Sequence, residues 1–176
     1  MGAKPKVNRK EFIMNSENEA KHLRNMIAVL RIVVGIIILA TWFDNFSKGV
    51  YTADGITGLF NWIFNEAGGG SPAYRSVINS TILQAPGLFA GFMMVAELLL
   101  GLGLTFGGLT TIAGWAATLF FFNLFLANQG GSEWIWTYVL LTVAGFVVAT
   151  TKSGRAFGLD QILLNSMGEP KNRWLW

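Results

Sequence analysis

The stretch PGLFAGFMMVAELLLGLGLTF, residues 86–106, decides the fold of this chain. It is as long as the roughly 20 mostly apolar residues that a helix needs to cross a bilayer. Glu97 is its only ionisable residue and lies near its middle. A carboxylate near the bilayer centre costs several kcal/mol, so such residues are usually paired, protonated or functional. We therefore expect a membrane-spanning helix with a polar group at its centre.

Three further apolar segments reach or approach the spanning length: Met26–Phe46, Thr110–Ala127 and Trp134–Thr151. Hydrophobic residues make up 52% of the chain and charged residues 13%, about half the charged share of a soluble domain. The sequence predicts an all-α integral membrane protein built as a bundle of four transmembrane helices. The long first loop, Ser47–Ala85, should contain short interfacial segments, because its apolar pieces are too short to span.

Composition divides the chain into three parts: a polar, basic N-terminal arm (1–25), the four-helix membrane domain (26–165) and a short aromatic C-terminal tail (166–176). Basic residues concentrate before the first span and after the last one, whereas the outer loops hold only Lys48 and Arg75. The positive-inside rule then places both termini in the cytoplasm. We expect a multi-pass protein of a bacterial or archaeal cytoplasmic membrane, with the lipid bilayer and other subunits as partners and no nucleic acid.

The residue types present limit the chemistry of the membrane helices. The chain has no cysteine, and its single histidine, His22, lies in the N-terminal arm. We expect no metal site and no haem, iron–sulfur or chlorophyll ligand within these helices. Redox chemistry would need a diffusible carrier such as a quinone, or a cofactor held by another subunit.

Glu97 should point into the bundle rather than into lipid. On a helical wheel it shares a face with the small residues Gly87, Gly91 and Gly101, and small residues allow helices to approach closely. Arg31 in the first helix is its expected partner, because the estimated depths of the two residues differ by only about 6 Å. We predict that Glu97 and Arg31 form a polar catalytic pair.

A second polar layer is expected nearer the outer surface, where Trp42, Asp44 and Asn123 would contact a quinone headgroup or substrate. The alternative is that these polar residues only hold the helices in register, at about 0.6–2 kcal/mol per interhelical hydrogen bond. A role in substrate or proton chemistry is favoured, because ionisable residues inside membranes are more often functional.

Several short features, in this order along the chain, resemble the DoxX/DoxD family. They are Leu30-Arg31, Asp44…Lys48-Gly49, Glu97 in Ala-Glu-Leu-Leu-Leu-Gly-Leu-Gly-Leu, Asn123, and Gly154-Arg155…Gly158-Leu159-Asp160. The resemblance covers about residues 26–165 and implies a four-helix membrane protein. DoxD-like members form the membrane subunit of thiosulfate:quinone oxidoreductase, beside a smaller partner.

We expect one of two functions, and the sequence does not decide whether the chain is itself an enzyme. The first is the membrane subunit of a quinone-linked oxidoreductase or electron-transfer complex, of the thiosulfate:quinone type, in which Glu97 exchanges protons with the reduced quinone. The alternative is a non-catalytic accessory or scaffold subunit of a larger respiratory or photosynthetic membrane complex, with the loop, arm and tail as docking elements. A small transporter is less favoured, because no discontinuous helix is evident.

Overall fold

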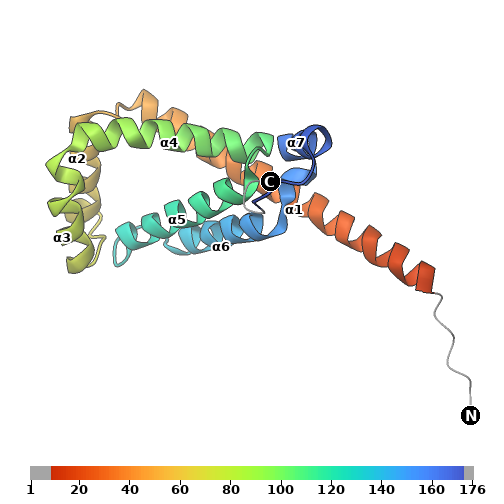
Figure 1. Cartoon of the computed structure of the whole chain (residues 1–176). Coiled ribbons are helices and arrows are strands. Elements are labelled where there is room, and N and C mark those ends of the chain that lie inside the picture. The colour runs from red at the N-terminus through yellow and green to blue at the C-terminus, as the bar shows by residue number, and fades with distance from the viewer. Residues whose placement is uncertain (1–8, 173–176) are drawn as a thin grey trace, which may run out of the picture.

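The computed structural model describes residues 9–172, and side chains from residue 14 onward, as an all-helical chain (Figure 1). Four helices form the bundle: α1 (Arg9–Ser47), α4 (Pro86–Phe106), α5 (Thr110–Asn128) and α6 (Trp136–Thr151). One end carries α2 (Ala53–Asn61), the π-turn η1 (Trp62–Glu66), α3 (Pro72–Ser80) and the 3-10 turn η2 (Ile82–Gln84). The other end carries the 3-10 turn η3 (Ser153–Arg155) and α7 (Leu159–Met167). The predicted helical class is confirmed, and no strand occurs among the described residues.

Three helices are long and apolar enough to cross a membrane: Met14–Ser47 within α1, Pro86–Phe106 and Thr110–Asn128. The fourth helix of the bundle, α6, is apolar but has only 16 residues. Large apolar side chains point outward from the bundle, including Leu88 at 79% exposure and Leu140 at 70%. Such a surface fits a lipid environment, because a water-soluble protein rarely exposes apolar patches of this extent.

Two pairs of helices approach each other closely at glycines, where no side chain separates the two backbones. A Cβ atom on Gly114 of α5 would lie 2.5 Å from the Ala149 nitrogen of α6, and one on Gly35 of α1 would lie 2.5 Å from the Thr105 nitrogen of α4. Small residues of this kind let membrane helices pack backbone to backbone. The bundle is therefore organised as two tight pairs, α1 with α4 and α5 with α6.

The α4–α5 connection is short, and the two helices diverge from it toward α2 and α3 (Figure 1). Gly107 ends α4 in the left-handed region, at φ 69°, which permits the sharp turn. At the far end, α2 and α3 pack on α4 through a separate apolar cluster that includes Ile56, Phe60 and Ile78. Two cavities lie between α4 and α5 where the helices diverge.

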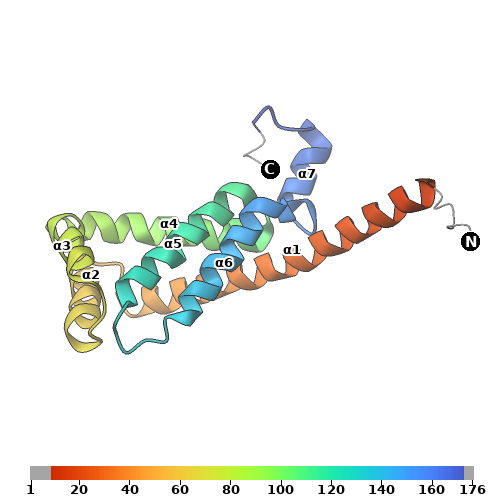
Figure 2. The same cartoon turned by 90° about the horizontal axis from the view of Figure 1, so that it is seen from below.

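The first part of α1 extends well beyond the bundle, on the side where α7 lies (Figures 1 and 2). The helix is continuous from Arg9, so the described part of the predicted arm belongs to the same helix as the first span. The outermost residues of the predicted arm and tail, 1–8 and 173–176, lie outside the described residues.

Candidate functional site

Glu97 is buried in the bundle, with only 2% of its surface exposed. The hydroxyl of Tyr51 donates a hydrogen bond to its Oε2 atom, and the half-buried side chain of Asn45 lies beside both groups. Among the described residues, the Oε1 atom has no hydrogen-bond partner. The structure thus confirms that the Glu97 side chain points into the bundle. Its Oε1 atom remains free to accept a hydrogen bond.

Tyr51 reaches Glu97 because the chain turns sharply after α1. Gly49 adopts a left-handed conformation at φ 71°, and the Val50 nitrogen donates to the Asn45 carbonyl at 2.9 Å. Burial, and then the neighbouring Glu97 carboxylate, raise the pKa of the Tyr51 phenol above its usual value. Tyr51 therefore stays protonated at neutral pH and acts as a donor.

The expected cofactor contacts Trp42 and Asp44 have other partners. The indole nitrogen of Trp42 donates to the Met94 carbonyl at 2.8 Å, which ties α1 to α4, and its ring lies 6.2 Å from the Tyr51 ring. Trp42 thus supports the site through Tyr51. Asp44 is exposed and pairs with Lys48 at 2.6 Å, so it lies at the surface rather than against Glu97.

A cavity of about 400 Å³ lies between α4 and α5, and Glu97 forms part of its wall. Asn123, predicted as a ligand contact, lines the same cavity on α5. The hydroxyl of Tyr74 on α3 donates to the Asn123 Oδ1 atom at 3.1 Å and also lines the cavity. Burial raises the pKa of the Tyr74 phenol, although the bond to Asn123 offsets part of this shift. We name this space the Glu97 cavity.

The remaining walls of the Glu97 cavity are apolar and largely aromatic. They are formed by Phe60, Phe89, Phe92, Met93, Ala96, Leu100, Ala116, Leu119, Phe120, Leu124 and Ala127. A mostly apolar cavity with a few polar groups is the usual form of a small-molecule site.

The predicted pairing of Arg31 with Glu97 is wrong. Arg31 is fully buried, and its guanidinium donates to three carbonyls near the start of α7, as described below. Its Nη1 atom packs against Gly107, and the distance along α4 from Glu97 to Gly107 is about 15 Å. Side chains in a helix lean toward its N-terminus. Because α1 and α4 are antiparallel, Arg31 and Glu97 lean away from each other.

Arg31 belongs instead to a second buried polar cluster, which we name the Arg31 cluster. Nη1 donates to the Ser153 carbonyl at 2.8 Å and the Ala156 carbonyl at 3.3 Å, and Nη2 donates to the Phe157 carbonyl at 3.0 Å. These carbonyls follow the left-handed end of α6 at Lys152. An arginine with several rigid donors suits such a set of backbone acceptors.

Asp160 completes the Arg31 cluster and is fully buried. Its carboxylate accepts from the Leu109 nitrogen at 2.7 Å, from the Thr110 nitrogen at 3.0 Å and from the Thr110 hydroxyl. These groups are the free donors at the N-terminus of α5, where a negative charge is stabilising. The cluster therefore joins α1, α5 and α7 and has a structural role.

The sequence analysis missed Tyr51 and Tyr74 as site residues. Tyr51 follows the Lys48-Gly49 turn at the end of the first helix, and this position was a usable signal. Tyr74 is placed by the fold of α3 over the α4–α5 opening, which no local pattern indicates. Within the described part of the chain, no three His, Asp or Glu side chains gather as a metal site would.

No family model, no curated protein and no solved structure matches this chain.

Proposed function

We propose that this chain is a DoxX/DoxD-like membrane protein and the quinone-binding membrane subunit of a quinone-linked oxidoreductase. The observation that carries the proposal is Glu97, a buried carboxyl with one unpartnered oxygen in the wall of a largely aromatic cavity. A quinone or quinol is an apolar ring with oxygen atoms that form hydrogen bonds, and this chemistry fits such a cavity.

The Glu97 cavity has hydrogen-bonding groups for the oxygen atoms on both sides of a quinone ring. A buried acceptor without a donor costs about 1–3 kcal/mol, and a quinol hydroxyl that donates to Glu97 Oε1 would recover that cost. Asn123 and Tyr74 supply amide and hydroxyl groups on the α5 and α3 sides of the same cavity. The aromatic side chains between them, such as Phe89 and Phe120, offer ring faces for stacking.

When bound, a quinone supplies two-electron chemistry that is coupled to proton uptake or release. Glu97 would exchange the proton at Oε1, while Tyr51 holds the carboxyl in place through Oε2. Tyr51 and Asn45 connect Glu97 to the α2–α3 end of the bundle. Toward α7 the next buried side chains along α4, Leu100 and Leu104, are apolar, so protons would exchange with the α2–α3 side.

The proposed placement in the membrane has four spans, with both termini in the cytoplasm and α2 and α3 on the outer side. At about 1.5 Å per residue, α6 is about 24 Å long. The exposed Trp136 at its first position and Trp134 just before it are suited to the outer interface. The host is a bacterial or archaeal cytoplasmic membrane. The electron donor would be held by a partner subunit, because the chain has no cysteine.

One observation favours the alternative of a non-catalytic accessory subunit. The first part of α1 projects beyond the bundle (Figure 2), and apolar side chains on it are exposed, with Met14 and Leu23 each at 58%. Such a helix suits docking to another subunit of a respiratory or photosynthetic complex. In that case the chain would co-migrate with a larger assembly but would bind no quinone.

The decisive test compares thiosulfate-dependent quinone reduction in native membranes that carry wild type, Glu97→Gln or Glu133→Gln. Glu133 is an exposed residue in the α5–α6 link and serves as the matched control. We expect Glu97→Gln to lower the rate on the order of a hundredfold, as for the loss of a general acid–base group, and Glu133→Gln to leave it unchanged. Equal rates for the two variants would remove Glu97 from the reaction.

A further inference from the structure

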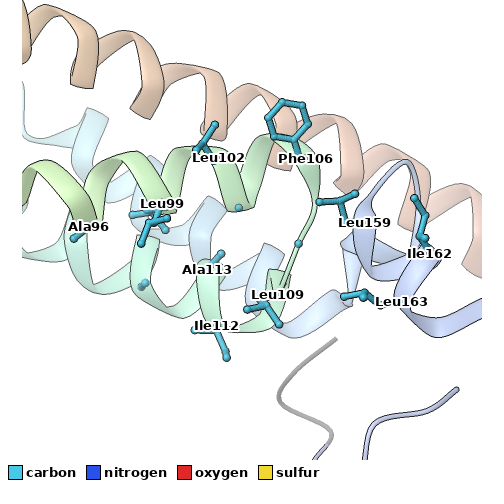
Figure 3. Close-up of a pocket in the computed structure, with 14 residues that line it drawn as sticks. Ala96, Leu99, Leu102, Phe106, Leu109, Ile112, Ala113, Leu159, Ile162 and Leu163 are labelled. Atoms are coloured by element: carbon cyan, nitrogen blue, oxygen red, sulfur yellow. The ribbon is translucent and has the colours of Figure 1, made fainter. Parts of the chain in front are cut away.

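A second, larger cavity of about 730 Å³ lies along the same two helices and extends to α7. All 14 residues that line it are apolar, and Figure 3 shows Leu159, Ile162 and Leu163 of α7 beside its α4 and α5 walls. We name it the α7 groove. Its position follows from the fold, because α4 and α5 contribute one wall each and α7 lies across their connected ends.

The α7 groove and the Glu97 cavity share part of their walls. Ala96 and Leu100 of α4 and Ala116 of α5 line both spaces. Two of these three side chains are alanines, so little side-chain bulk separates the two spaces. The two spaces are therefore neighbouring parts of one seam between α4 and α5.

The seam is polar at only one end. Glu97, Tyr74 and Asn123 lie around the first cavity, whereas the groove that follows is apolar throughout. From Glu97 to the end of α4 at Gly107, the seam runs for about 15 Å. Its shape and polarity match a molecule with one hydrogen-bonding head and one long apolar chain.

We propose that the seam binds a single tailed quinone or quinol, with its ring in the Glu97 cavity and its apolar tail in the α7 groove. This inference rests on the proposed function and adds the direction and extent of the ligand. Lipid chains are as apolar as the tail, so entry into the groove brings no hydrophobic gain. The tail occupies the groove because it is attached to a ring that is held next to it.

Two photoreactive quinone analogues with the same ring test the inference on the full-length protein in nanodiscs. One carries a diazirine beside the ring, and the other carries it at the end of an apolar tail of about 15 Å, the length of the seam. We expect the first to label α4 and α5 around Glu97 and the second to label Leu159–Leu163. An excess of the unlabelled ring compound should suppress labelling by both.

The variant Ile112→Trp fills part of the α7 groove without touching the Glu97 cavity, and Ile37→Trp on the exposed side of α1 is its matched control. We expect Ile112→Trp to reduce α7 labelling by the tailed analogue at least fivefold while ring labelling persists, and Ile37→Trp to change neither. Tail labelling spread evenly over exposed residues of α1 and α6, with ring labelling intact, would overturn the inference and leave the proposed function standing. So would α7 labelling by a photoreactive phospholipid but not by the tailed analogue.

Failure of the proposed function has a different signature. If the ring analogue gives no saturable labelling around Glu97 in the wild type, the chain holds no quinone site. The tail inference then falls with it.

Discussion

The Glu97 cavity and the Arg31 cluster are both buried polar regions of the same bundle, but they differ in how far their carboxylates are satisfied. Both carboxylate oxygens of Asp160 accept hydrogen bonds, and Arg31 donates to three carbonyls. Glu97 has Tyr51 on one oxygen and no partner on the other among the described residues. A buried carboxylate with donors on both oxygens supports the fold, whereas one left incomplete beside a cavity indicates a place for a ligand.

The location of each region fits this difference. The Arg31 cluster lies where α1, α5 and α7 meet, and the Asp160 nitrogen donates to the Gly107 carbonyl at 2.9 Å within it. The Glu97 cavity lies where α4 and α5 diverge, and the hydrogen bond between Tyr74 and Asn123 joins α3 to α5 there. In the tightly packed region both oxygens of the Asp160 carboxylate have donors, although Arg31 Nε and Ser153 Oγ have no partner among the described residues. The Glu97 carboxylate beside the cavity keeps one oxygen without a partner.

The largest expected effect is on the Arg31 cluster. Asp160→Ala removes the acceptor for three donors at the start of α5, so we expect the free energy of unfolding to fall by about 3–5 kcal/mol. Denaturant titration in mixed micelles, followed by circular dichroism, measures it. Asp44→Ala is the control, because its exposed pair with Lys48 should contribute less than about 1 kcal/mol. Equal losses for both variants would contradict the structural role of the cluster.

A smaller fall in the free energy of unfolding is expected when a substitution disturbs the packing of the Arg31 cluster but removes no charge. A Cβ atom on Gly154 would overlap Asp160 Oδ2 and lie 2.6 Å from Thr110 Cγ2, so Gly154→Ala should cost about 1–3 kcal/mol. Gly91→Ala on α4 meets nothing within 4 Å and should be neutral or slightly stabilising. The same titration compares the two. A neutral Gly154→Ala would show that the cluster can rearrange.

The smallest expected effect concerns pH and the Glu97 cavity. The folded protein has a raised pKa at Tyr51, whereas the unfolded value is about 10. Above about pH 10 the unfolded chain therefore loses this proton first, and the stability contributed by protonated Tyr51 is lost as the pH rises toward the folded pKa. Wild type should thus lose stability more steeply than Tyr51→Phe above pH 10. Between pH 7 and 9 the free energy of unfolding should change with pH equally in the two proteins. Parallel curves of this free energy at all pH values would contradict the burial of the Tyr51 phenol.

The helices and the direction of Glu97 could be predicted from local pattern alone. A single apolar run of membrane length forms a helix because a lone segment has no other way to satisfy its backbone within a bilayer. Of the small residues on the predicted packing face, Gly101 packs against Leu39 and Ile38 of α1, whereas Gly91 faces open space. The partner of Glu97 could not be predicted in this way. Depth was estimated from the position of each residue along its helix, which ignores the direction in which the side chain leans. Because the Arg31 and Glu97 side chains lean in opposite directions, they do not meet.

The sequence by itself determined the all-helical class, the apolar spans, the inward position of Glu97 and the absence of cysteine ligands. Each of these depends on residue type or on helical periodicity, which are local properties. The tertiary structure alone decided that Tyr51 bonds to Glu97, that Asp160 caps α5, and that α4 and α5 diverge to leave a cavity. These contacts join residues far apart in the chain, and their geometry depends on how whole helices pack and where the connecting turns direct them.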